Sequence, residues 1–203
     1  NYVMKKYGYN ERNLSDIRKL AGKGSKAMLA RSINEVAELS GKIKKTDSNI
    51  EKMTKEFINF YSKNILAEST LKKGVLDFLK WCKNNFISMG VCTNKQETLS
   101  IDLLKKIKIY NFFDYVAGGD TFSYNKPDPR HLTSAIEIMG GSVEKSLMVG
   151  DSETDSNSAK SANIPFILLE NGYTEKTTAQ IHHNHLVKDF VGLEKIIREY
   201  IND

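Results

Sequence analysis

The chain has 203 residues, of which 40% are hydrophobic and 27% charged, with 13 glycines and three prolines. These proportions are ordinary for a globular protein and exclude collagen-like, low-complexity and largely disordered chains. The longest uninterrupted apolar run, residues 164–169, is much shorter than the roughly 18 residues expected of a membrane-spanning helix. Two cysteines are too few for a disulfide framework. We therefore expect a cytoplasmic protein with no membrane partner.

The net charge is +5, from 30 basic and 25 acidic residues, which brings anionic partners such as nucleic acid into consideration. The basic residues occur as scattered pairs, such as Lys72-Lys73 and Lys105-Lys106, among apolar residues at helical spacing. That pattern is typical of solvated helix faces, and no zinc-finger, RNP-type or heptad motif accompanies it. We expect no nucleic-acid partner. The alternative, a basic nucleic-acid-binding module, would show affinity that falls steeply with salt.

The first third of the chain carries only helical patterns. Apolar spacing predicts one helix from Leu14 to Leu20, ended by Gly22, and a second that begins at Ser25 and stops at Gly41. A third is predicted from Ile50 to Phe60. Because no strand pattern interrupts them, we expect residues 1–67 to form a small helical domain.

From about residue 68 the pattern changes to strands alternating with amphipathic helices. Short apolar strands are predicted at residues 86–92, 115–117, 146–149 and 166–169, and a last helix spans 193–200. Asn94 followed by Glu97 resembles a capping box that opens the helix after the first strand. Such alternation favours a parallel sheet covered on both faces. We expect residues 68–203 to form a doubly wound α/β core.

Polar residues follow the predicted strands, where an open parallel sheet binds its ligands. Thr93 and Asn94 follow the first strand and open a helix, whose free N–H groups and dipole favour an anion such as phosphate. Alternatively, the pair only caps that helix. Lys126, after the second strand, is biased toward an extended conformation by Pro127 and could face an oxyanion. The alternative is an ordinary surface lysine.

The third strand ends in the most specific signal of the chain, residues 150–155. Asp151 and Asp155 lie four residues apart at a helix start, so both carboxylates can face the same space. Two carboxylates beside an anion site repel each other unless a cation intervenes, and an oxygen-only ligand set suits Mg²⁺. Alternatively, the two aspartates only stabilise the helix N-terminus.

A histidine cluster at residues 182–185 raises the question of a zinc site. Alternate residues of a strand, or neighbours on a loop, do not converge easily on one tetrahedral ion, and no cysteine lies nearby in the sequence. We interpret the cluster as a polar edge loop before Leu186 and Val187.

Segments 91–94, 125–129 and 149–155, in this order after successive strands, resemble the haloacid dehalogenase superfamily of phosphatases over essentially the whole chain. Within it, the chain is most similar to phosphoglycolate phosphatases, which insert a helical cap after the first strand of the core. Residues 7–9 and 20–24 resemble segments of that cap. The resemblance implies Mg²⁺-dependent hydrolysis of a small phosphorylated metabolite, with 2-phosphoglycolate as the first expectation, by a monomer or homodimer.

The resemblance also implies roles for individual residues. Thr93 and Asn94 would hold the transferring phosphoryl group, and Lys126 would neutralise it and the nucleophile. Asp151 would bind Mg²⁺, with Asp155 supporting the ion through water.

On the cap, the resemblance points to one loop. Gly22, Lys23 and Gly24 would face the active site when the cap closes and help to choose the substrate. A lysine flanked by glycines is suited to a second anionic group, such as a carboxylate.

The superfamily's nucleophile lies in an Asp-x-Asp motif that occurs nowhere in these 203 residues. By the resemblance, the motif would end a central strand upstream of Asn1, and without that strand two neighbours would lack a hydrogen-bonding partner. We therefore expect the natural protein to extend upstream. Two alternatives stay open: an inactive phosphate-binding or regulatory protein, and a phosphosugar mutase with the same cap. A dehalogenase is less favoured, because those enzymes work without the metal.

Overall fold

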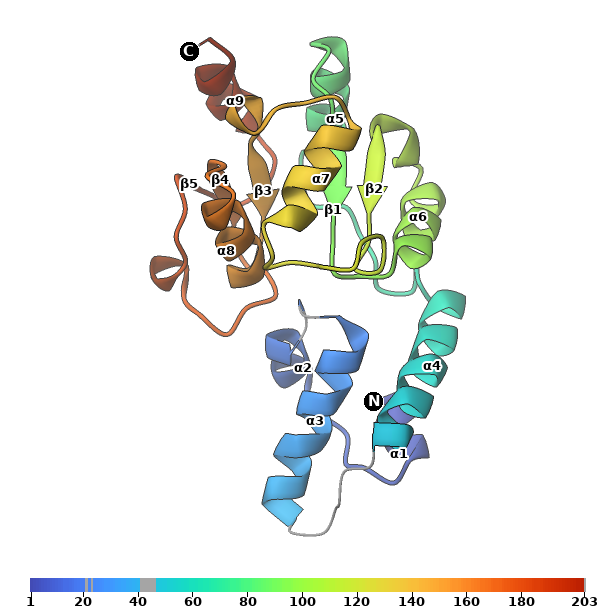
Figure 1. The fold of residues 1–203 in the computed structure, drawn as a ribbon. Coiled ribbons are helices and arrows are strands. Elements are labelled where there is room, and N and C mark those ends of the chain that lie inside the picture. Colours follow the sequence, from blue (N-terminus) through green and yellow to red (C-terminus); the bar gives the residue numbers. More distant parts are fainter. Residues whose placement is uncertain (21, 23, 41–46, 203) are drawn as a thin grey trace.

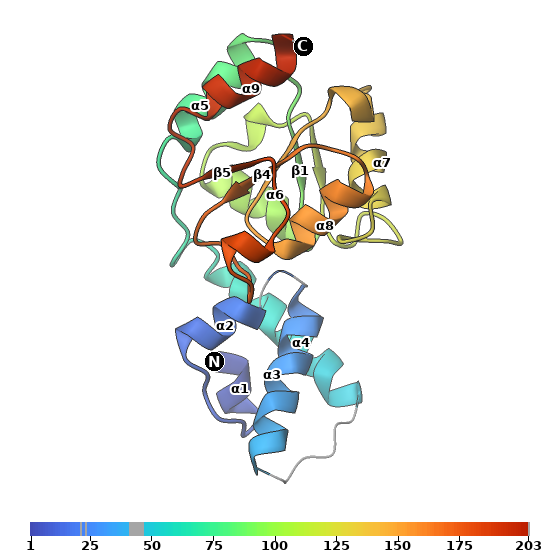
Figure 2. The same ribbon diagram turned by 90° about the vertical axis from the view of Figure 1, so that its left-hand side faces the viewer.

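The computed structural model describes residues 1–20, 22, 24–40 and 47–202, and these form two units (Figures 1 and 2). Four helices lie at one end: α1 (Tyr2–Lys6), α2 (Leu14–Leu20), α3 (Ser25–Ser40) and α4 (Asp47–Lys63). The three helices expected from the sequence are all present, and α1 precedes them. The expected stop at Gly41 lies outside the described residues. We call α1 to α4 the helical unit; a domain boundary at residue 67 stays a prediction.

The helical unit has a core of its own. The buried apolar side chains of this core come from α1, α3 and α4: Val3, Met4, Leu29, Ile33, Ile50 and Met53. Those of α3 and α4 recur three or four residues apart, which gives each helix one apolar face. Burying each such side chain contributes about 1.5–3 kcal/mol. The unit is thus held by its own contacts as well as by those to the rest of the chain.

The second unit, which we call the α/β unit, alternates helices and strands. Its elements are α5 (Val75–Asn84), β1 (Gly90–Cys92), α6 (Glu97–Lys106), β2 (Tyr115–Ala117), α7 (Arg130–Ile138), β3 (Met148–Gly150), α8 (Glu153–Ser161), β4 (Phe166–Leu169), β5 (His185–Val187) and α9 (Leu193–Asn202). Short 3-10 turns occupy Tyr110–Phe112, Val143–Lys145 and Thr178–Gln180.

Every strand pair is parallel, as the sequence predicts. β1 pairs with β2 in the register Val91 to Val116, and β4 lies between β3 and β5 with Ile167 opposite Val149 and His185. Within the described residues, β1 and β3 are not hydrogen-bonded to each other, so the strands form two sheets. Helix α7 contacts β1, β2 and α8 and therefore spans the junction (Figure 1).

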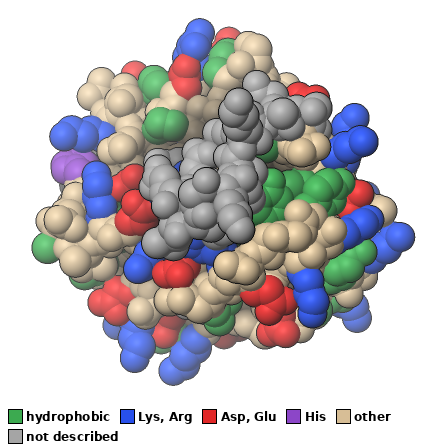
Figure 3. All heavy atoms as spheres, turned by 90° about the horizontal axis from the view of Figure 1, so that it is seen from below, with side chains coloured by type: hydrophobic (Ala, Val, Ile, Leu, Met, Phe, Trp, Pro, Cys, Tyr) green, Lys and Arg blue, Asp and Glu red, His purple; other side chains and the backbone are tan. Residues whose placement is uncertain are grey.

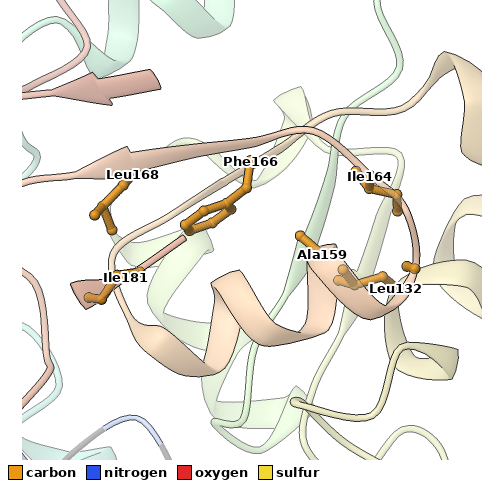
Figure 4. Packing of buried hydrophobic residues seen from close by; sticks show 7 residues of the cluster. Leu132, Ala159, Ile164, Phe166, Leu168 and Ile181 are labelled. Carbon is orange, nitrogen blue, oxygen red and sulfur yellow. The ribbon is translucent and has the colours of Figure 1, made fainter. Parts of the chain in front are cut away.

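Strand β4 separates two apolar layers, because successive side chains of a strand point to opposite faces. Phe166 and Leu168 pack toward α7 and α8, with Leu132 and Ala159 among their partners (Figure 4). Ile167 faces the other way and packs with apolar residues of α5 and α9, including Leu193 and Ile197. All four β4 side chains are buried. This double covering confirms the predicted doubly wound α/β class.

Three local predictions were wrong. The first strand begins at Gly90, because Phe86 has φ +56° in the turn that ends α5 and is 96% exposed. The expected capping box at Asn94 is absent: α6 begins at Glu97, whose N–H donates to Asp120 Oδ1 at 2.8 Å. His185 belongs to strand β5 rather than to a loop.

The described residues contain no helix that is both long and apolar enough to span a bilayer. Seen from the end of the helical unit, the Lys and Arg side chains are spread around the rim among Asp and Glu (Figure 3). In this view, the described Lys and Arg side chains do not gather into one continuous basic patch of the kind that nucleic acid binds.

Candidate active site

Lys126 lies in the loop after β2, with only 8% of the residue exposed. Its ammonium donates to Asp155 Oδ1 at 2.6 Å and to the carbonyl of Cys92, the last residue of β1, at 2.5 Å. A buried ammonium is tolerated only when it is paired and hydrogen-bonded. Lys126 therefore links the ends of the two sheets, one through β1 and the other through α8.

Asp155, in the first turn of α8, is 6% exposed and has both oxygens engaged. Oδ2 accepts from Ser152 Oγ at 2.8 Å and from the N–H groups of Ser152 and Asp151 at 3.1 Å. Ser152 Oγ accepts in turn from the Asp155 N–H, which completes a capping box. A Cβ at Gly150 would lie 2.6 Å from the Asp155 Cβ, so glycine makes room for this carboxylate. Both oxygens are thus held within the protein, Oδ1 by Lys126 and Oδ2 by the turn at residues 151–152.

Asp151 lies between β3 and α8 and is half-buried. Burial raises the pKa of its carboxyl group, and the charge of Asp155 adds to the rise. The charges of Lys72 and Lys126 and the dipole of the Tyr173 N–H act in the opposite direction and lower this pKa. A cation beside Asp151 would stabilise the ionised carboxylate, so this residue fits one ligand position of an Mg²⁺ site. The described residues contain no cluster of three or more His, Cys, Asp or Glu that could hold a metal.

Thr93 and Asn94 directly follow β1. The Thr93 N–H donates to Ala117 O at 2.9 Å, and Thr93 Oγ1 accepts from the Lys95 N–H at 3.1 Å. The Asn94 amide donates to Lys126 O at 2.9 Å, while its buried Oδ1 has no partner among the described residues. Asn94 and Lys126, expected from the sequence to act together, are thus in contact.

The helical unit reaches this site through the loop before α3. The Asn94 amide also donates to Gly22 O at 3.0 Å, and a Cβ on Gly24 would lie 3.4 Å from Asn94 O. Gly22 and Gly24 have φ of +95° and +86°, which glycine adopts at little cost. Lys23 lies outside the described residues.

His131 on α7 supports the site and was missed in the sequence. It is fully buried, and Nε2 lies 2.9 Å from Gly118 O, to which it must donate. The neighbouring Gly119 is so close to Asn94 that an added Cβ would lie 2.6 Å from Asn94 O. Burial lowers the pKa of His131. A histidine two residues after Pro129, at the start of an amphipathic helix, carries no signal that separates this role from ordinary packing.

The chain matches the family model of haloacid dehalogenase-like hydrolases over residues 1–169. It is 32% identical to a phosphoglycolate phosphatase of Mesorhizobium japonicum, with 89% of this chain and 80% of the relative covered. It is also 32% identical to a phosphoglycolate phosphatase of Agrobacterium fabrum, with 91% and 77% covered.

Two solved structures share the fold. A crystal structure described as a predicted phosphoglycolate phosphatase from Haemophilus somnus has a TM-score of 0.90 at 24% identity, with 97% of this chain and 87% of the other covered. A β-phosphoglucomutase from Clostridium difficile has a TM-score of 0.77 at 18% identity, with 99% and 87% covered. The family model and the curated relatives together show that the chain belongs to the haloacid dehalogenase-like hydrolases.

Proposed function

We propose that this chain provides the phosphoryl-binding site of a phosphatase for small phosphomonoesters, with 2-phosphoglycolate as the preferred substrate. The observation that carries the proposal is the buried Lys126, held between Asp155 and the end of β1 beside Asn94. The names of the two curated relatives support the same activity. The mutase shares only the fold at 18% identity, so it does not favour a mutase function here.

Each proposed binding role follows from the chemistry of the side chain. The Lys126 ammonium has three N–H donors, of which two are used within the protein, so the third can bind a phosphoryl oxygen. The Thr93 hydroxyl and the N–H groups of the turn that follows it can donate to the other oxygens. Donors fixed in advance stabilise the charge that develops during phosphoryl transfer.

Asp151 would hold Mg²⁺, which when bound would offset negative charge on the phosphoryl group. Asp155 would support Asp151 indirectly, by keeping Lys126 and the turn at residues 150–152 in position. We also propose that Asp155 supports the ion through a water molecule.

The nucleophile is proposed to be an aspartate of an Asp-x-Asp motif upstream of residue 1. It would attack phosphorus and break the P–O bond to the leaving alcohol, whose oxygen would take a proton from the second aspartate of the motif; water, giving that proton back, would then hydrolyse the aspartyl-phosphate to inorganic phosphate and the free carboxylate. A peptide strand entering between β1 and β3, which are not paired with each other, would bring that aspartate to the end of the sheet where Lys126 lies.

Residues 1–67 are proposed to act as a cap that excludes bulk water and limits the substrate to small molecules. Lys23 would bind the second anionic group of the substrate, the carboxylate in the case of phosphoglycolate. We also propose a cytoplasmic location and a monomer or homodimer. Cys82 and Cys92 suit a reducing compartment, since both are free thiols and burial raises the pKa of each to about 11.

The test is phosphate release from a panel of small phosphomonoesters, with and without Mg²⁺, by the product extended upstream to the next start codon. Phosphoglycolate is expected to give the highest kcat/KM and to require the ion. A folded protein that binds phosphate and hydrolyses no member of the panel would favour the inactive binding protein instead. Interconversion of sugar phosphates without net phosphate release would favour the mutase.

A further inference from the structure

The segment between β4 and the turn at Thr178–Gln180 contacts both units of the molecule, and we call residues 170–176 the bridging loop. Its middle lies against Asp151: an added Cβ on Gly172 would lie 2.6 Å from the Asp151 Cβ. Gly172 is so close that an added Cβ would overlap the Asp151 carbonyl oxygen. The bridging loop therefore packs directly on the proposed metal ligand.

The far end of the bridging loop is tied to the helical unit. Glu175 forms an ion pair with Arg31 of α3, 144 residues away in sequence. A Cβ on Gly22 would lie 3.4 Å from Tyr173 O, so the loop before α3 also lies close. On the α/β side, Lys176 Nζ pairs with Glu153 Oε2 at 3.1 Å. At Glu175 and Lys176 the loop is thus tied to both units, and at its start the Glu170 N–H donates to Val187 O at 2.9 Å.

The Arg31–Glu175 pair is accessible to water and ions. The two side chains are 31% and 49% exposed and line an open groove of about 390 Å³ together with Arg12, Asp16, Lys19 and Leu20. An exposed ion pair contributes little to global stability and weakens as salt is added. A weak attachment can nevertheless set the position of a loop whose remaining backbone has few partners.

We propose that the Arg31–Glu175 ion pair positions Asp151 through the bridging loop, which makes Arg31 and Glu175 positioning residues for the phosphatase reaction. The inference rests on the proposed function for the role of Asp151, but the coupling itself concerns only residues of this chain. Contact between α3 and Glu175 holds the loop in place, and Gly172 of the loop packs against Asp151. The helical unit then affects the site by a route separate from the Gly22–Asn94 contact.

The test is amide hydrogen exchange at Tyr173 in the protein extended upstream, which reports how firmly the bridging loop is held against Asp151 without requiring turnover. Arg31→Glu and Glu175→Arg should each speed exchange about two- to fivefold, the size expected when an exposed pair is lost. The double variant, with the charges exchanged, should return the rate toward wild type. High salt should speed exchange in the wild type and change the single variants less.

Lys26→Glu is the matched control. It reverses a charge on the same helix, but Lys26 pairs with Glu51 of α4 and does not reach the bridging loop. It should leave Tyr173 exchange unchanged. The proposal is overturned if Arg31→Glu has no effect, if Lys26→Glu has the same effect, or if the double variant shows no recovery.

A further variant changes the bridging loop itself. Gly172→Ala should speed Tyr173 exchange while both charged partners stay in place, because its Cβ forces the loop away from Asp151. Unchanged exchange in Gly172→Ala would show that the loop does not rest on Asp151 and would also overturn the proposal.

Activity of the extended protein separates the two claims. If the exchange pattern is as expected but no phosphomonoester is hydrolysed, the coupling stands and the proposed function fails. If phosphoglycolate is hydrolysed while Tyr173 exchange is the same in every variant, the proposed function stands and the coupling fails.

Discussion

The candidate active site in the α/β unit and the junction with the helical unit each contain an ion pair, and the two pairs differ in how far water reaches them. At the site, Lys126 and Asp155 are 8% and 6% exposed, and every oxygen of the aspartate is hydrogen-bonded. At the junction, the side chains of Arg31 and Glu175 are 31% and 49% exposed and pair across two units. Removing one partner of a buried ion pair is strongly destabilising, because the other charge is left buried and unpaired. An exposed ion pair contributes little to stability, so breaking it costs little. Under the proposed function, the difference would separate a fixed phosphoryl-binding framework from contacts that adjust it.

The largest effect should follow from removing Asp155. Asp155→Ala leaves the Lys126 ammonium buried without its carboxylate and removes the capping box of α8. Breaking a buried ion pair costs about 3–5 kcal/mol. We expect the free energy of unfolding, measured by urea titration, to fall by that amount.

The matched control is Asp102→Asn, which breaks an exposed pair with Lys106 in α6, where both side chains are 41% exposed. It should cost less than about 0.5 kcal/mol. Equal losses in the two variants would remove the distinction between buried and exposed charge in this molecule.

Asp151→Asn should separate function from stability within the same site. We expect a loss of at least about 100-fold in Mg²⁺-dependent kcat in the extended protein, because a neutral amide is a poor ligand for a hard cation. Unfolding free energy should stay within about 1 kcal/mol of wild type, since burial and Asp155 already raise the pKa of this carboxyl group. Unchanged activity would defeat the metal assignment.

A smaller, pH-dependent effect is expected at His131. Burial lowers its pKa from the ordinary 6.5, so below pH 6.5 the unfolded chain binds more protons than the folded one at this residue. Its contribution to stability is therefore present above pH 6.5 and lost as pH falls toward the folded pKa. His131→Gln keeps an amide donor and cannot titrate. Between about pH 7.5 and about pH 5.5, its free energy of unfolding should fall by up to about 1.4 kcal/mol less than that of the wild type. If the free energy of unfolding, measured by urea titration, falls equally in the variant and the wild type, a buried neutral imidazole is contradicted.

The smallest effect on catalysis should come from Lys23→Ala. The variant is expected to lower kcat/KM several-fold for substrates with a second anionic group and to leave Mg²⁺ dependence as it is. Steady-state kinetics on phosphoglycolate and an uncharged phosphomonoester provide the comparison. Equal losses on both substrates would exclude a role for Lys23 in substrate choice.

The sequence predicts well where local pattern and tertiary structure agree. Strands 115–117 and 166–169 are found as expected, since each is a short apolar run bounded by turns. The pattern fails at Phe86, where an apolar residue closes α5 in a left-handed turn and is exposed. An apolar run alone does not distinguish these two cases.

At the candidate site, local sequence pattern does not predict which residues the side chains contact. Asn94 has the local pattern of a helix cap, but its amide binds Lys126 O and Gly22 O, partners that lie 32 and 72 residues away. The Arg31–Glu175 pair is likewise invisible to any local rule. Motif and spacing therefore single out candidate residues, while the contacts that orient them depend on the folded chain.

The central claim is that this chain supplies the phosphoryl-binding and metal-binding side chains but not the nucleophile. Its most direct test is Mg²⁺-dependent phosphate release from 2-phosphoglycolate, measured side by side on the 203-residue chain and on the product extended upstream. We expect turnover in the extended protein alone. Turnover by the 203-residue chain, or none by either protein when both are folded, would contradict it.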